Sequence, residues 1–149
     1  MELDTAQFGV VDVKEKQIFN FPKGIPGFEE YTQFAVIDLP DGPFSYLQSV
    51  QESQIALLIT DPFIFFPDYE FELSDHAIEE LELGTLLMIR CILTLNKEVS
   101  KSTINLLAPV VFNLETQRAK QVILHSTEYS SRHFLWSKEE PSLADKAGE

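Results

Sequence analysis

Few side chains in this sequence have the types and the spacing that catalysis or metal binding requires. The three histidines (His76, His125 and His133) and the single cysteine, Cys91, form no His-Glu-x-x-His, Cys-x-x-Cys or calcium-loop pattern. A nucleophilic Ser, Thr or Cys needs a neighbouring base, and the Gly-x-Ser-x-Gly motif is absent. We therefore expect no catalytic residue, no metal ligand and no bound cofactor.

Two features that could suggest chemistry have simpler structural interpretations. Cys91 lies on an apolar face of an expected strand, where burial raises a thiol pKa and makes the group unreactive. Residues 24–27 (GIPG) could suggest a phosphate-binding loop, but no Lys-Ser/Thr follows and Pro26 lacks a backbone donor. A turn between two strands, flanked by Phe21 and Phe28 as core anchors, explains this segment better.

Carboxylates are the abundant functional group, and they are unevenly distributed. The formal net charge is −13, and residues 24–89 contain no Lys or Arg. The acidic residues of that segment are Glu29, Glu30, Asp38, Asp41, Glu52, Asp61, Asp68, Glu70, Glu72, Asp75, Glu79, Glu80 and Glu82. Such a surface repels phosphate backbones and attracts a basic protein, which argues against direct nucleic-acid binding. Two interpretations stay open, a solvated acidic face and a surface that faces a partner.

An aromatic stretch within this acidic segment favours the second interpretation. Residues 61–69 (DPFIFFPDY) place a run of Phe and Ile between two prolines, so these side chains point both inward and outward. Some of Phe63, Ile64, Phe65, Phe66 and Tyr69 could form an exposed apolar patch with an acidic rim, as protein-binding sites do. The alternative is that a loop or helix covers them.

Short apolar runs separated by Gly, Pro, Asp and Asn predict the elements that position these residues. The pattern is typical of a mostly β, antiparallel domain, with strands expected at 8–13, 16–21, 33–38, 44–48, 54–60, 85–95, 103–113 and 120–126. Both faces of 85–95 are apolar, so this strand should be central. One short helix is expected over 75–83, with Ser74 or Asp75 as N-cap and Gly84 just past its end.

Pro109 interrupts the otherwise strong strand pattern of residues 103–113. Proline cannot donate to a β-ladder and is confined to edges and bulges. An edge or bulged strand here could pack conventionally or accept an added segment from a partner.

The length of 149 residues fits one domain, which we place at 1–136, followed by a flexible polar tail at 137–149. The first residues lack the features of a secretory signal, and no apolar run could span a bilayer. We expect a cytoplasmic protein that does not contact the membrane.

Several short motifs resemble the flagellar assembly factor FliW family, in the order that the family shows. They are 21–29 (FPKGIPGFE), 44–49 (FSYLQS), 61–62 (DP), 67–69 (PDY), 105–110 (NLLAPV), 121–124 (QVIL) and Tyr129. Each alone is weak, but together they are specific and cover about residues 8–135.

The resemblance implies a non-enzymatic, β-barrel-like cytoplasmic protein. Such a protein would bind newly made flagellin as a chaperone and alternatively bind CsrA, an RNA-binding translational repressor. Sequestering CsrA would free flagellin messenger RNA for translation, and accumulating flagellin would recapture the factor.

Residues for the two partners are hypothesised from the sequence pattern. For CsrA they are Phe65, Phe66 and Tyr69 as apolar anchors, with Glu70, Glu72, Glu79, Glu80 and Glu82 as steering charges. For flagellin they are Asn105, Leu106, Ala108 and Pro109, which would border a groove or strand edge. The alternatives are an acidic interaction module of an unrelated cytoplasmic pathway and, more remotely, an enzyme with a dispersed carboxylate site.

Overall fold

The computed structural model describes residues 1–82, 84, 86–125 and 127–136. Its strands are β1 (Glu2–Thr5), β2 (Gly9–Asp12), β3 (Ile18–Asn20), β4 (Gln33–Asp38), β5 (Phe44–Ser49), β6 (Ala56–Thr60), β7 (Leu87–Thr94), β8 (Thr103–Ile104), β9 (Val110–Asn113), β10 (Arg118–Gln121) and β11 (His133–Phe134). Its helices are α1 (Pro62–Phe65) and α2 (Asp75–Leu81), with short 3-10 helices at Glu15–Gln17 and Val99–Lys101. The expectation of a mostly β fold with a short helix near residues 75–83 is confirmed.

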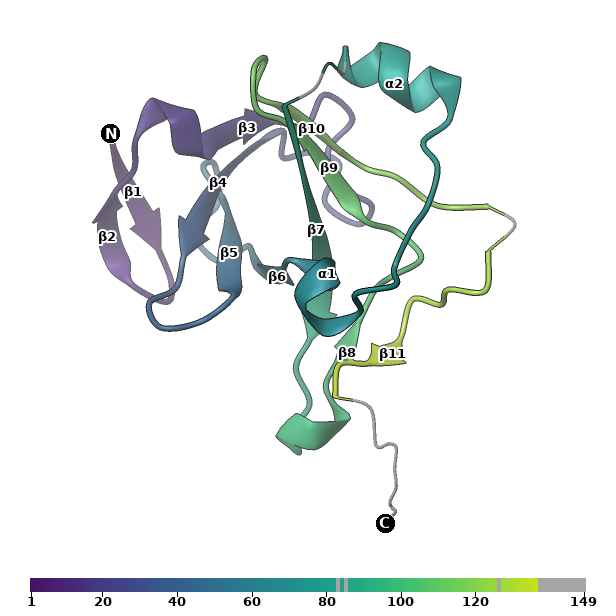
Figure 1. The fold of residues 1–149 in the computed structure, drawn as a ribbon. Coiled ribbons are helices and arrows are strands. Elements are labelled where there is room, and N and C mark those ends of the chain that lie inside the picture. The colour runs from purple at the N-terminus through teal and green to yellow at the C-terminus, as the bar shows by residue number, and fades with distance from the viewer. Residues whose placement is uncertain (83, 85, 126, 137–149) are drawn as a thin grey trace.

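Among the described residues, strands β3, β4, β5, β6, β7, β9 and β10 form a closed barrel (Figure 1). Each strand from β3 to β7 pairs antiparallel with the next, β7 pairs antiparallel with β9, and β9 with β10. The ring closes where Arg118 of β10 lies beside Asn20 of β3, a parallel contact at one position. Closure gives the barrel strands two neighbours each, which removes most free edges. The expected barrel-like architecture is therefore confirmed, with one parallel contact in an otherwise antiparallel ring.

Phenylalanines fill the barrel. Phe19, Phe21, Phe34 and Phe112 are buried, and their rings meet edge to face with centroids 4.9 to 6.0 Å apart. Each buried ring of this kind stabilises the fold by about 1.5–3 kcal/mol relative to an exposed one. The predicted core role of Phe21 is confirmed, and Phe28 packs against the same cluster.

Strand β7 packs against apolar clusters on both faces, as its apolar pattern predicts. Met88 and Ile92 pack toward the barrel core, whereas Cys91 and Leu93 belong to a second cluster outside the barrel. Three strands (β6, β8 and β9) pair with β7. Helices α1 and α2 and the C-terminal segment lie over this side of the barrel (Figure 1).

The segment 103–113 is not one strand. It forms β8 and β9, separated by residues 105–109, where the side chain of Asn105 accepts a hydrogen bond from the Ala108 N–H at 3.0 Å. The expected break at Pro109 is confirmed, but this segment is no edge. The carbonyls of Leu107 and Pro109 accept hydrogen bonds from Leu124 and Val122.

Element ends differ from expectation in a few places. Ser74 is the N-cap of α2, and its side chain accepts from the Ala77 N–H at 3.1 Å. The helix stops at Leu81 because Glu82 adopts the left-handed conformation (φ 53°), so the expected stop at Gly84 is wrong by two positions. Strands β1 and β11 and helix α1 were not expected. The predicted tail at 137–149 lies outside the described residues.

Gly24 ends the turn at β3 in a conformation that only glycine adopts easily. Its φ is +67°, and an added Cβ would lie 2.6 Å from the Cα of Glu29. A Gly24→Ala change should therefore lower the free energy of unfolding by about 2–3 kcal/mol, since it adds backbone strain and a clash with main chain. Gly42→Ala is the matched control, because the nearest atom to its Cβ is a Phe44 side-chain carbon at 3.6 Å. Urea denaturation of both variants measures this, and equal midpoints would contradict the assignment.

Candidate protein-binding surface

Two exposed acidic residues lie on residues 69–74, an extended segment between α1 and α2 that we call the strap. Its side chains alternate, with Tyr69, Phe71 and Leu73 packed inward and Glu70, Glu72 and Ser74 exposed. The Glu70 N–H donates to the hydroxyl oxygen of Tyr129 at 3.0 Å, which fixes the strap to the C-terminal segment. This alternation places the carboxylates of Glu70 and Glu72 on the same outer side.

Tyr69 is a core residue, so its predicted role as an exposed anchor is wrong. Only 4% of it is exposed, and its hydroxyl donates to the carbonyl of Leu106 at 2.8 Å. Its ring contacts Phe63, Phe71 and Tyr129 at centroid distances of 4.7 to 5.6 Å. Burial raises the pKa of the hydroxyl, which therefore stays a neutral donor. The hydroxyl holds the start of the strap against the segment that follows β8.

The exposed apolar residues next to the strap are Phe63 (41% exposed) and Ile64 (56% exposed). Phe65 and Phe66, the hypothesised anchors, are half-buried: Phe65 stacks on Phe44 with centroids 5.9 Å apart, and Phe66 contacts His133. The reason is helix α1, whose N-cap Asp61 accepts from the Phe63 N–H at 2.9 Å. One helical turn directs Phe63 and Ile64 outward, whereas an extended run would have alternated.

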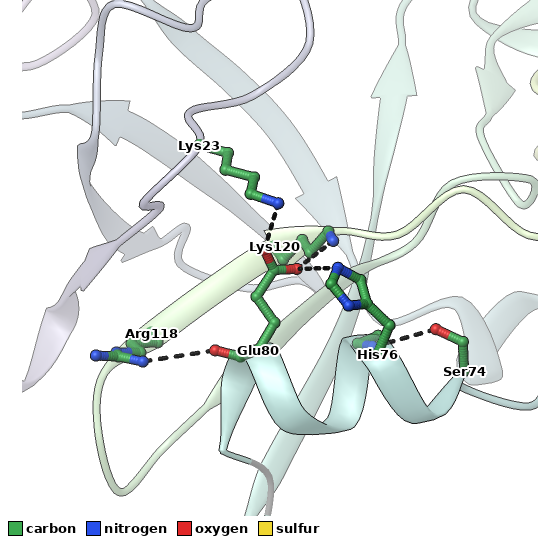
Figure 2. Close-up of polar contacts among 7 residues, drawn as sticks. Lys23, Ser74, His76, Glu80, Arg118 and Lys120 are labelled. Carbon is green, nitrogen blue, oxygen red and sulfur yellow. Dashed lines mark hydrogen bonds and ion pairs between the residues drawn. The ribbon is translucent and has the colours of Figure 1, made fainter.

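Two of the hypothesised steering charges are already paired. Figure 2 shows Lys23, Lys120 and His76 around the carboxylate of Glu80, with Lys23 at 2.6 Å and His76 at 3.9 Å. Hydrogen bonds from Lys120 and then Lys23 lower the pKa of Glu80 to about 2. Glu82 pairs with Arg118 at 3.3 Å. These contacts hold α2 to β10 and to the turn after β3, so both carboxylates are largely compensated.

Three of the hypothesised charges remain uncompensated within the part of the chain that the structure describes. Glu70, Glu72 and Glu79 are exposed and form no ion pair with a described Lys, Arg or His. We call Glu70, Glu72 and Glu79 the acidic strip. Of these three, Glu72 lines a groove of about 500 Å³ between the strap, the start of α2 and residues 120–125, and Glu70 lines the hollow that adjoins it.

The hypothesised flagellin residues are mostly inaccessible. Leu106, Ala108 and Pro109 are buried, and Asn105 is half-buried with its side chain used in a turn. The buried side chains of Leu106, Ala108 and Pro109 are not available as direct contacts, and the Leu107 and Pro109 carbonyls pair with the N–H groups of Leu124 and Val122. That these residues border a flagellin site stays a prediction.

The structure also places the residues that first suggested chemistry. Cys91 is buried, and burial raises the pKa of its thiol to about 12. In the described ranges, no group of three or more His, Cys, Asp or Glu side chains lies close enough to hold a metal ion. Among those same residues, no helix has the length and apolar character needed to span a membrane.

Similarity to known proteins covers nearly the whole chain. A family model described as "FliW protein" matches residues 2–135. The chain is 41% identical over 153 residues to the flagellar assembly factor FliW of Desulfitobacterium hafniense strain Y51, covering 99% of each. It is 41% identical over 136 residues to that of Bacillus subtilis, covering 89% of this chain and 95% of the relative. A solved structure described as "Crystal structure of the flagellar assembly factor FliW" superposes with a TM-score of 0.86 at 37% identity, covering 93% of this chain and 99% of that one.

The ion cluster at Glu80 should make the attachment of α2 depend on pH. Because the folded-state pKa is about 2 and the ordinary value is 4.5, the carboxylate stabilises the fold fully above about pH 5, and this contribution is lost as pH falls toward 2. Glu80→Gln should lower the free energy of unfolding by about 1 kcal/mol at pH 7, as for other partly exposed pairs. The difference from the parent should shrink steadily between pH 5 and pH 2 in thermal unfolding.

The matched control is Glu79→Gln on the exposed side of the same helix, which should change stability little at any pH. A Glu80→Gln deficit that persists unchanged at pH 2 would show that the charge of Glu80 is not what stabilises the helix.

Proposed function

Because the chain belongs to the FliW family of flagellar assembly factors, we propose that it binds flagellin before export and alternatively binds the translational repressor CsrA. Binding of CsrA relieves repression of flagellin messenger RNA, and free flagellin recaptures the factor and restores repression. The protein thus acts by binding other proteins in the cytoplasm, where flagellin is made. No catalytic step is proposed.

The observation that carries the CsrA part of the proposal is the acidic strip. A protein that represses messenger RNA needs basic residues to hold phosphates. Glu70, Glu72 and Glu79 have no basic partner among the described residues, so they are available to steer such a protein and to pair with it. The exposed Phe63 and Ile64 replace the anchors first hypothesised, since Phe65 and Phe66 pack against the cluster around Tyr69.

Flagellin is the expected partner of an assembly factor for the flagellum, and its binding completes the switch. Segments of an unassembled filament subunit that later become buried are expected to be amphipathic and incompletely folded. The factor would cover such a segment and thereby prevent premature association. Competition between flagellin and CsrA for one pool of the factor couples translation to the supply of unassembled flagellin.

The switch can be tested by titrating this protein into CsrA bound to fluorescent flagellin-leader RNA. We expect RNA release as the protein is added, followed by renewed RNA binding when flagellin is added in excess. Fluorescence anisotropy follows both steps. Unchanged anisotropy at saturating concentrations of the protein would contradict the CsrA part, and release that flagellin fails to reverse would contradict the partner exchange.

The acidic strip can be tested by reversing the two strap charges together. Glu70→Lys with Glu72→Lys should slow CsrA association by about tenfold at low salt, since electrostatic steering acts mainly on the association rate. It should also flatten the dependence of that rate on ionic strength.

The matched control reverses Glu2 and Asp4, two exposed acids at the same spacing on β1, at a distance from the strap (Figure 1). Stopped-flow kinetics of both double variants gives the comparison. Equal effects would show that net charge, and not the strip, governs association.

A further inference from the structure

One strand edge stays open next to the point where the barrel closes. Strand β3 pairs with β10 only at Asn20 and Arg118, while the chain after β10 continues along residues 107–109. There the N–H of Val122 donates to the Pro109 carbonyl and the N–H of Leu124 to the Leu107 carbonyl, each at 2.8 Å.

The open edge is formed by the residues that alternate with Val122 and Leu124. Backbone groups of an antiparallel strand point to alternate sides, so the N–H and C=O of Gln121 and Ile123 point away from residues 107–109. Within the described part of the chain, no turn or loop hydrogen bond reaches these backbone groups, and the alternation of the ladder makes Gln121 and Val110 a pair without hydrogen bonds between them. Four backbone groups on one extended segment are thus available to another strand.

This edge lies in the groove beside the strap. Gln121, Ile123 and His125 line the groove together with Glu72 and His76, and it continues past Leu124 to Glu70. Ile123, a large apolar residue in the extended segment after β10, is 54% exposed. The lining of this groove therefore combines an exposed apolar side chain, the strand edge at Gln121 and Ile123, and the carboxylates of Glu70 and Glu72.

The charge of the groove indicates what would fill it. Glu70 and Glu72 have no ion-pair partner among the described residues, and the nearby Lys120 is occupied by Glu80. Alternate residues of a strand are about 6.8 Å apart, and the two glutamates are themselves alternate residues of an extended segment. Basic side chains at every second position of a bound strand would therefore match them in spacing and sign.

We propose that this groove binds an extended segment of a partner protein in which basic and apolar residues alternate. The segment adds a strand beside Gln121 and Ile123, its basic side chains pair with Glu70 and Glu72, and its apolar side chains pack on Ile123. The proposal builds on the proposed function in one respect, that the partner of the acidic strip is a basic protein.

The probe for this site is a peptide of alternating lysine and valine, about nine residues long, the length of an ordinary strand. Titrated into the full chain, it should slow hydrogen exchange of the Gln121 and Ile123 amides by about tenfold, because both become hydrogen-bonded. A peptide of alternating glutamate and valine, and a lysine peptide with N-methyl groups on consecutive central residues, should each bind at least about tenfold more weakly.

The matched variants are Ile123→Pro and Ile123→Thr. Proline removes the edge donor without breaking a hydrogen bond of the fold, whereas threonine keeps that donor and loses similar apolar area. Ile123→Pro should lower the affinity for the lysine peptide by about fivefold more than Ile123→Thr does, as measured by calorimetry. Circular dichroism reports whether each variant is folded, and the N-methylated peptide tests the same contact on the unmodified chain.

The proposal is overturned if the lysine peptide fails to bind, if its N-methylated form binds equally well, or if protection appears elsewhere than at Gln121 and Ile123. Flagellin and CsrA titrated into the same samples separate this result from the proposed function. Peptide binding by a chain that binds neither protein would support the groove and contradict the switch. Binding of the proteins without the peptide would overturn the groove and leave the switch standing.

Discussion

Closure of the barrel is the constraint on which the rest of this structure depends. Asn20 and Arg118 are far apart in the sequence, and their single parallel contact joins the first strand of the ring to the last. Because β3 turns away directly after Asn20, the chain beyond β10 gains a neighbour on one side only. A longer β3 would have covered Gln121 and Ile123, so the shortness of one strand creates the open edge of its neighbour.

The carboxylates near this edge have two different roles, one structural and one available for binding, because they lie on different backbone elements. On α2, Glu80 points back toward β10 and is neutralised by two lysines, which attaches the helix to the barrel. On the strap, alternate side chains point to opposite sides, so Phe71 packs inward and Glu70 and Glu72 point outward. The hydrogen bond from the Tyr69 hydroxyl to the Leu106 carbonyl fixes the start of the strap in this position. Similar residues in one acidic segment are thus structural in one place and available in the other.

Local patterns in the sequence predicted local structure well. A short apolar run located β4 at its observed bounds, two-sided apolarity predicted that β7 is central, and Ser74 was one of the two expected N-caps of α2. Contacts between segments far apart in the sequence could not be predicted from local patterns. The Tyr69 hydroxyl bonds to the Leu106 carbonyl, and the residues on either side of Ala108 pair with Leu124 and Val122; both contacts join segments that are separated in the sequence. The acidic residues were therefore predicted from composition, whereas the exposure of Phe63 and Ile64 in place of Phe65 and Phe66 follows from the one-turn helix α1, which the sequence pattern did not predict.

Cys91 has a practical consequence for anyone who studies this protein. It is the only cysteine in the chain, and its side chain is buried where β7 packs against the aromatic cluster around Tyr69. A maleimide dye would therefore find no native attachment point on the folded molecule. A single cysteine introduced at a surface position could be labelled selectively without first removing the natural one, so distance measurements by fluorescence transfer could be made on an otherwise unaltered core.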